Sequence, residues 1–251
     1  MLKSLSFATI LTLVGTLLAS AATPAAELTV SAASSLTQAF REVAAGFEAA
    51  RPGTKVLLNF AASDALLAQI AKGAPVDLFA SADQETMDKA AARNLLRAGS
   101  RQTFAGNQLV LITPFEGGLS LTKLADLQGV NVKRIAMGQP ESVPAGRYAR
   151  RALQALWPQL QTKIIYAQNV RQALDYVARG EVDAGLVYAT DARAQAAKVK
   201  VRFSVPTETP ISYPAAVIAG TREPELAQAF IAYLQSPAGQ ALLAGQGFVA
   251  P

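Results

Sequence analysis

Residues 28–47 read LTVSAASSLTQAFREVAAGF, and this stretch decides the class of fold. It starts with the short apolar run Leu28–Val30 between polar neighbours, a pattern typical of a β-strand. Apolar residues then return at the i, i+4, i+7 and i+11 spacing of one helix face: Leu36, Phe40, Val43 and Phe47. We therefore predict a strand that leads through a short turn directly into an amphipathic helix.

The same alternation continues along the chain. Eight more short apolar runs are candidate strands: Val56–Phe60, Leu78–Ala80, Leu109–Thr113, Arg134–Met137, Lys163–Tyr166, Ala184–Val187, Val201–Val205 and Ala215–Ile218. Helical stretches lie between them, for example the one in which Val170, Leu174 and Val177 share a face. Strands that alternate with helices favour parallel sheets covered by helices, so the predicted class is α/β. One large sheet and two smaller sheets fit this pattern equally well.

Four of the predicted strand-to-helix turns offer small or polar residues at the start of a helix. They are Ser31–Leu36, Ala61–Asp64, Gly138–Gly146 and Ala167–Val170. The first turn of a helix has unpaired backbone N–H groups and a partial positive charge, which suit an anion. In open α/β sheets such helix starts face the edge where ligands settle. Several of them together could surround a tetrahedral oxyanion with uncharged donors.

Each of these residues also has a plain structural interpretation. Ser34 or Ser35, Ser63 and Asn169 are good helix N-caps, and Asp64 could be the cap in place of Ser63. Ser81 with Gln84 fits a capping box. Tyr188, at the end of a predicted strand, reads by itself as a half-buried core residue.

Composition excludes several classes of function. The 251 residues are 51% hydrophobic and 16% charged, which is typical of a folded chain. Cysteine and histidine are both absent, so disulfides, thiolate or imidazole metal sites, Ser-His-Asp triads and cysteine nucleophiles are excluded. The net charge of +5 is scattered without a basic stripe, which argues against nucleic-acid binding. No pair of carboxylates marks the candidate turns, so we predict a protein that is not an enzyme and needs no cofactor.

The N-terminus has the order of a secretory signal peptide. Lys3 precedes a mostly apolar stretch, 5–18, and small residues follow at 19–22. A membrane anchor is the weaker alternative, because the apolar stretch is short for a span of about 20 residues. We expect residues 1–26 to be removed and the mature protein to be periplasmic.

Taken in order, the motifs of this chain resemble the ModA-type family of molybdate-binding proteins, periplasmic components of bacterial ABC importers. The motifs that carry the resemblance are 32–36 AASSL, 60–63 FAAS, 73–83 GAPVDLFASAD, 106–107 GN, 143–146 VPAG, 169–171 NVR and 185–192 GLVYATDA. The similarity runs from Glu27 to Phe248, nearly the whole of the predicted mature chain.

The resemblance implies a type II periplasmic binding protein fold with two lobes, each a sheet flanked by helices, and a ligand cleft between them. The first lobe would take residues 27–109 plus 214–251, and the second lobe 110–213. The oxyanion would be held by Ser35 and Ser63 from one lobe and by Ala145, Val170 and Tyr188 from the other. The implied function is capture of molybdate, with tungstate as a second ligand, and its delivery to a membrane ABC permease by a monomer.

Two positions depart from the family pattern. Ser34 precedes Ser35, which leaves the donor in that turn open. Asp64 follows Ser63 where a small neutral residue is expected, and a carboxylate in the cleft would repel a dianion. We therefore predict that Asp64 faces outward as a helix cap. If it lined the cleft, a protonated oxyanion such as hydrogen phosphate would fit better. A receptor for sulfate, phosphate or another small anion is the alternative within the same class of protein.

Overall fold

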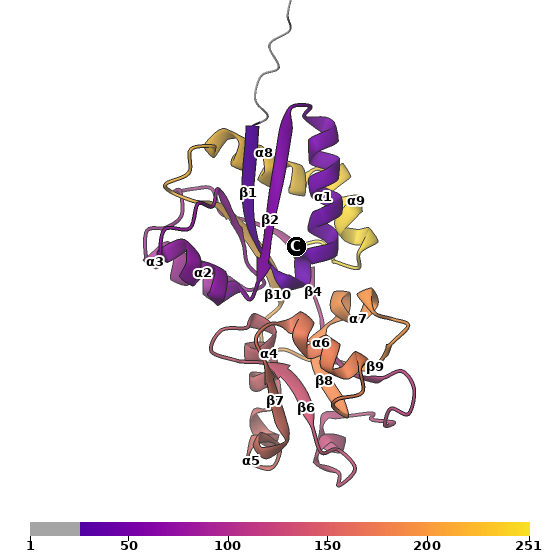
Figure 1. The fold of residues 1–251 in the computed structure, drawn as a ribbon. Helices are drawn as coiled ribbons and strands as arrows, with labels where there is room; N and C mark the ends of the chain where they lie inside the picture. The colour runs from indigo at the N-terminus through magenta and orange to yellow at the C-terminus, as the bar shows by residue number, and fades with distance from the viewer. Residues whose placement is uncertain (1–25) are drawn as a thin grey trace, which may run out of the picture.

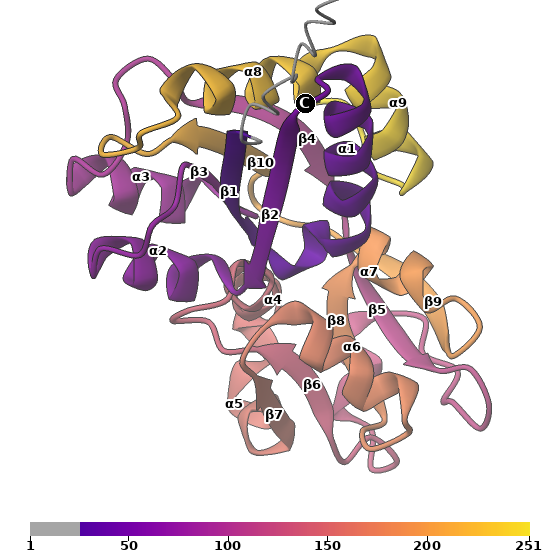
Figure 2. The ribbon, with the colours of Figure 1, turned by 45° about the horizontal axis from the view of Figure 1, so that its top comes forward.

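A computed structural model describes residues 26–251 (Figure 1). The predicted signal peptide, apart from Ala26, lies outside the described residues. The described chain forms two five-stranded sheets, each with helices packed on it. We use "first lobe" for the first sheet with its helices and "second lobe" for the second sheet with its helices; Figure 2 shows the first lobe above the second.

The first sheet has the strand order β2-β1-β3-β10-β4. Its strands are β1 (Ala26–Ala33), β2 (Thr54–Ala61), β3 (Leu78–Ala80), β4 (Gln102–Asn107) and β10 (Ile211–Val217). β1 runs parallel to β2 and β3, whereas β10 is antiparallel to β3 and β4. Helices α1 (Thr37–Ala50), α8 (Pro224–Gln235) and α9 (Pro237–Gly245) lie on one side of this sheet, and α2 (Ser63–Ala71) and α3 (Gln84–Ala92) on the other (Figure 1).

The second sheet has the order β7-β6-β8-β5-β9. Its strands are β5 (Leu109–Pro114), β6 (Ile135–Gly138), β7 (Ile164–Ala167), β8 (Ala184–Tyr188) and β9 (Val199–Val205). β6 is parallel to β7 and β8, and β5 is antiparallel to β8 and β9. The α-helices of this lobe are α4 (Pro144–Ala152), α5 (Trp157–Leu160), α6 (Val170–Ala178) and α7 (Ala189–Ala194). Short 3-10 turns complete the described chain: Ser34–Leu36, Leu124–Gln128, Gln154–Leu156 and Gln161–Lys163.

The expectation of wholly parallel sheets is wrong: both sheets are mixed. The chain leaves the first lobe at β4 and returns at β10, so each sheet contains a strand that belongs to a crossing between lobes. β5 enters the second lobe directly after β4, and β10 enters the first lobe directly after β9, with no helix before either strand. Both strands run antiparallel to their neighbours. The class α/β and the two-lobed architecture are confirmed.

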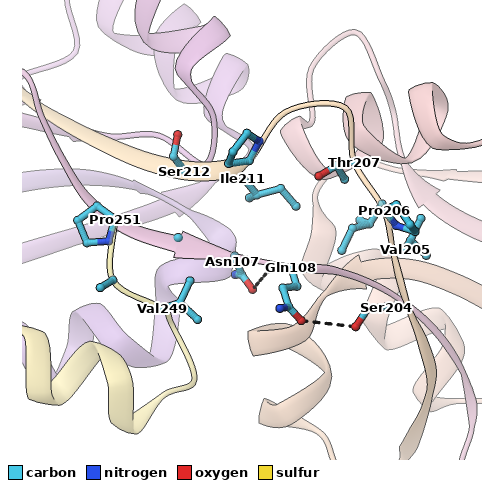
Figure 3. A pocket seen from close by; sticks show the side chains of 14 residues that line it. Asn107, Gln108, Ser204, Val205, Pro206, Thr207, Ile211, Ser212, Val249 and Pro251 are labelled. Carbon is cyan, nitrogen blue, oxygen red and sulfur yellow. Dashed lines mark hydrogen bonds between the residues drawn. The ribbon is translucent and has the colours of Figure 1, made fainter.

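The two crossings lie next to each other. A single residue, Gln108, separates β4 from β5, and residues 206–210 separate β9 from β10. Figure 3 shows the groove that these segments line together with the C-terminal residues Val249 and Pro251. The Ser204 hydroxyl donates to Gln108 Oε1 at 3.4 Å, and Gly106 and Val249 exchange two backbone hydrogen bonds. The division of lobes at 109 and 213 stays a prediction.

Most of the largest fully buried side chains, Tyr188 of β8 apart, belong to the first lobe. Phe47 and Phe40 of α1 make edge contacts with Phe230 of α8, with ring centroids 5.1 and 5.9 Å apart. These are residues of the helix face that the periodicity predicts, so burial of that face fixes α1 on the sheet. Among residues 26–251, none of the helices combines the length and apolar character that a membrane crossing needs.

Candidate functional site

The five residues selected from the sequence lie around one pocket between the lobes. Ser35 and Ser63 reach it from the first lobe, and Ala145, Val170 and Tyr188 from the second. The other lining residues are small or apolar: Ala33, Ser34, Ala61, Ala62, Ala82, Val143 and Pro144. The cavity that these atoms enclose has a volume of about 10 Å³. On this measure one water molecule needs roughly 10–15 Å³, so the lobes are packed closely around the pocket.

Four helical starts converge on this pocket. Ser35 belongs to the 3-10 turn that runs into α1, Ser63 is the first residue of α2, Ala145 is the second of α4, and Val170 is the first of α6. Backbone N–H groups in the first turn of a helix have no acceptor within that helix. The pocket is thus surrounded by uncharged donors with partial positive charge.

The hydroxyl groups at the pocket are ordered by neighbours from distant parts of the chain. Ser35 Oγ lies 3.1 Å from the Tyr213 hydroxyl, and Ser63 Oγ accepts a hydrogen bond from the Ala82 N–H at 3.1 Å. The Tyr188 hydroxyl donates across the cleft to the Ala82 carbonyl at 3.3 Å. Burial raises the pKa of Tyr188 well above its ordinary value, so this hydroxyl keeps its proton and remains a donor. Both Ser34 and Ser35 line the pocket, so the sequence ambiguity between them persists.

The helix caps correct part of the sequence interpretation. Asn169 caps α6, its side chain accepting from the Gln172 N–H at 3.0 Å. Ser63 does not cap α2: the cap position is Ala62, which has no side-chain acceptor. The predicted capping box of Ser81 with Gln84 is wrong, since α3 is capped by the carboxylate of Asp83, which accepts from the Thr86 N–H.

Asp64 does not face outward as a cap, so that prediction is wrong as well. Its carboxylate accepts hydrogen bonds from Arg147 Nη2 at 2.8 Å, Lys89 Nζ at 3.0 Å and Thr86 Oγ1 at 2.9 Å. It is absent from the pocket lining. Burial alone would raise the pKa of Asp64, but the charge of Arg147 and these hydrogen bonds bring it below its ordinary value. The carboxylate is therefore ionised and paired with cations beside the pocket.

Asp64 belongs to a cluster of six charges, three acidic and three basic, that spans the cleft: Asp64, Asp83, Glu85, Lys89, Arg147 and Arg151. Arg147 is at its centre and is only 7% exposed. Burial would lower the pKa of this guanidinium, but Asp83 and Asp64 raise it above its ordinary value. Because the formal charges cancel, the cluster adds little net field at the pocket.

A second ion pair lies behind the pocket wall. Arg171 Nε is 2.6 Å from Oδ1 of Asp191, which is fully buried. Asp191 also accepts from the Tyr188 N–H at 3.3 Å, and Arg171 Nη2 donates to the Ser35 carbonyl at 3.4 Å. Burial raises the pKa of Asp191 to about 6, against the opposing effect of Arg171. The pair thus connects two residues of the pocket.

Sequence reasoning missed Arg147, Asp83, Arg171 and Asp191. Arg147 directly follows the motif 143–146, and Arg171 is the last residue of the motif 169–171. Nothing in a single sequence indicates which acidic residue each arginine contacts. The departure at Asp64 was the available signal, since an acid next to an anion site needs a compensating cation. Residues 26–251 contain no group of three or more acidic side chains placed to hold a metal ion.

A family model for bacterial extracellular solute-binding proteins matches residues 28–249. The molybdate-binding protein ModA of Escherichia coli (strain K12) is 38% identical over 234 residues, which cover 88% of each chain. The chain belongs to the ModA-type family of solute-binding proteins.

Two solved structures share the fold of this chain. The Azotobacter vinelandii periplasmic molybdate-binding protein superposes with a TM-score of 0.79 at 29% identity, covering 89% of this chain and 99% of that one. The sulfate-binding protein SubI of Mycobacterium tuberculosis gives a TM-score of 0.80 at 18% identity, covering 89% and 86% of the two chains. At that identity the second match speaks for the fold alone, which ModA-type proteins share with receptors for other anions.

Proposed function

We propose that this protein captures molybdate in the pocket between its lobes and delivers it to an ABC permease. The observation that carries the proposal is the convergence of Ser35, Ser63, Ala145, Val170 and Tyr188 on one pocket between the lobes. The name of the E. coli relative supports molybdate as the ligand. Tungstate, which has the same shape and charge, is the proposed second ligand.

The donors at the pocket suit a dianion that carries no proton. Backbone N–H groups and hydroxyls can satisfy four oxygens, and their dipoles oppose the negative charge. No carboxylate lines the pocket, so there is no strong acceptor for the proton of a hydrogen phosphate ion. Sulfate is the stronger alternative ligand, because only the size of the cavity would separate two tetrahedral dianions.

The proposal extends to the setting of the protein. Residues 1–26 act as a signal peptide, the mature protein is a periplasmic monomer, and the division of lobes follows 27–109 plus 214–251 and 110–213. Binding and release, without catalysis or a cofactor, constitute its activity. The family membership supports a solute receptor outside the cytoplasm.

Molybdate is expected to stabilise the purified protein against heat. A ligand that binds only the folded state adds RT ln(1 + [L]/Kd), about 2.7 kcal/mol at a hundredfold excess over Kd. This corresponds to a rise of several degrees in Tm for a chain of this size. The measurement is a thermal-shift panel of molybdate, tungstate, sulfate and phosphate at equal ionic strength. A response to sulfate or phosphate without one to molybdate would replace the proposed ligand.

Removing single hydroxyls should weaken molybdate binding in steps. Tyr188→Phe and Ser63→Ala each remove one donor to a charged acceptor, so each should cost roughly 1.5–3 kcal/mol of binding free energy. Isothermal titration calorimetry measures the loss. Tyr176→Phe, on α6 but outside the pocket lining, is the matched control and should bind like the parent. Unchanged affinity in both pocket variants would refute this choice of ligand residues.

A further inference from the structure

A chain of hydrogen bonds runs from one crossing between the lobes to the Ser35 hydroxyl at the pocket. Asn107, the last residue of β4, donates through Nδ2 to the Tyr213 hydroxyl at 3.1 Å. The Tyr213 hydroxyl lies 3.1 Å from Ser35 Oγ. All three residues are buried, so water competes little for these bonds.

The first bond of the chain has a fixed direction. The side-chain oxygen of Asn107 accepts from the Gln108 N–H at 2.9 Å, a bond that Figure 3 shows. The amide nitrogen therefore lies on the other side, where it donates to Tyr213 and, at 2.9 Å, to Thr190 Oγ1. If the amide were turned over, its NH2 group would face the Gln108 N–H, and neither donor would have an acceptor. Asn107 is thus a donor to Tyr213.

The direction of the second bond follows from the first. A phenol has one proton, and burial raises the pKa of Tyr213 well above its ordinary value, so the hydroxyl keeps that proton. The hydroxyl oxygen accepts from Asn107, and the described residues give the hydroxyl one further hydrogen-bond partner, Ser35 Oγ. Because a buried donor without an acceptor is costly, Tyr213 donates to Ser35.

The two serines that we assign to the ligand are arranged in the same way. Ser63 Oγ accepts from the Ala82 N–H, as Ser35 Oγ accepts from Tyr213. In each case the protein fills an acceptor position of the oxygen, and the proton of the hydroxyl is left for the pocket. Ser34 lines the pocket too, but there it is the carbonyl that accepts, from Thr37 Oγ1.

We infer that Tyr213 and Asn107 are positioning residues that fix the Ser35 hydroxyl as a donor to the bound oxyanion, and that Ser35 rather than Ser34 is the donor in that turn. The inference rests on the proposed function in that an oxyanion occupies the pocket. Neither Tyr213 nor Asn107 lines the pocket, so both act through Ser35. A hydroxyl that already accepts a hydrogen bond is a stronger donor and a poorer acceptor, which favours an oxyanion without a proton of its own.

The test measures the cost of Ser35→Ala in three backgrounds. The parent, Tyr213→Phe and Asn107→Asp are titrated with molybdate in a calorimeter, each with and without Ser35→Ala. In the parent, Ser35→Ala should raise Kd about tenfold to a hundredfold, because it removes a hydrogen bond to a charged acceptor. In Tyr213→Phe the serine hydroxyl is no longer oriented, so the cost of Ser35→Ala should be at least about threefold smaller.

Asn107→Asp is expected to reverse the chain. A carboxylate at this position accepts from the Tyr213 hydroxyl, so Tyr213 accepts from Ser35 and the serine proton turns away from the pocket. Ser35→Ala should then change Kd by less than about threefold. The added charge repels the oxyanion with and without Ser35, so the comparison cancels this effect. If Asn107→Asp does not fold, Tyr213→Phe, which keeps the packing of the ring, decides the test.

Ser212→Ala is the matched control. It removes a hydroxyl from the residue next to Tyr213 on β10, and that hydroxyl accepts from Gln84 Nε2 instead of taking part in the chain. In this background Ser35→Ala should cost as much as in the parent. An equal cost in Tyr213→Phe and Asn107→Asp as well would overturn the inference, because a merely structural role lowers affinity equally with and without Ser35. A larger cost of Ser34→Ala than of Ser35→Ala would overturn the choice of serine.

A neutron structure of the deuterated, ligand-free protein tests the same chain without molybdate. We expect the deuterium of the Tyr213 hydroxyl to lie between its oxygen and Ser35 Oγ. A Ser35 deuterium directed at the Tyr213 oxygen would overturn the inference. If the parent does not bind molybdate, the proposed ligand is refuted, and the neutron structure still decides the direction of the chain.

Discussion

Replacement of Arg171 by leucine is expected to lower the free energy of unfolding by about 3–5 kcal/mol at about pH 8. The partner of Arg171, Asp191, is fully buried, and its Oδ1 lies 2.6 Å from Arg171 Nε. Removal of the cation leaves a carboxylate away from water with a single long hydrogen bond from the Tyr188 N–H. Urea unfolding of the parent and the variant measures the difference.

The cost of Arg171→Leu should depend on pH in a defined direction. Burial raises the pKa of Asp191 to about 6 in the folded parent, from an ordinary value of 3.8. The folded state therefore binds more protons than the unfolded state between these values, and this group makes stability fall as pH rises through them. In the parent, this loss of stability ends above about pH 6. Without the guanidinium, the pKa of Asp191 in the folded state is higher, so the free energy of unfolding keeps falling at higher pH.

The difference between parent and variant should thus be smaller at about pH 5 than at about pH 8, growing by up to about 1.4 kcal/mol per pH unit above about pH 6. Arg171→Leu combined with Asp191→Asn is the control, because it removes the buried charge and with it most of the pH dependence. A difference that is constant from about pH 5 to 8 would show that Arg171 stabilises the fold by some means other than its pairing with Asp191.

Gly146→Ala is expected to destabilise the fold by about 3 kcal/mol, the upper end of the usual cost of an overpacked site. A Cβ at this position would stand 2.1 Å from the Gly138 carbonyl oxygen and 2.6 Å from its carbon. Both are backbone atoms of β6, so α4 must move away from the sheet. Since α4 also carries Ala145 and Arg147, the same movement should weaken molybdate binding.

Urea unfolding and calorimetric titration of Gly146→Ala measure the two effects. The matched control is Gly245→Ala in α9, where a Cβ meets no heavy atom within 4 Å. That substitution should leave binding unchanged and stabilise the fold by about 0.4–1 kcal/mol, because alanine restricts the unfolded chain. Normal stability of Gly146→Ala would mean that α4 and β6 separate at little cost.

Much of the fold could be predicted from periodicity. The runs at β1, β2 and β3 and the face of α1 that carries Phe40 and Phe47 lie where the pattern predicts, since burial on a sheet demands that pattern. β4 was missed. Its sequence, QTFAGN, forms an edge strand of the sheet whose neighbouring strand is β10, and five of its six residues are small or polar. Strand direction was also missed, because it depends on where the chain crosses between lobes.

The pocket residues of the site could be predicted from the sequence, but the ion pairs beside the pocket could not. Small polar residues at helix starts, together with the family resemblance, led to the five residues of the pocket, since a helix start is a local feature. The ion pairs Arg147 with Asp83 and Arg171 with Asp191 join residues 64 and 20 positions apart. Which charge meets which is decided by tertiary packing, and a single sequence carries no signal of it.

The C-terminal residues lie closer to the pocket than their place in the sequence suggests. Phe248 packs edge-on against Tyr213, with ring centroids 5.2 Å apart, and the Tyr213 hydroxyl is next to Ser35 Oγ. Val249 is bonded to Gly106, two residues before Gln108. An affinity tag or fluorescent reporter fused after Pro251 would therefore lie beside the two crossings between the lobes, and we expect it to shift the measured affinity. Such fusions belong on an exposed loop far from both crossings.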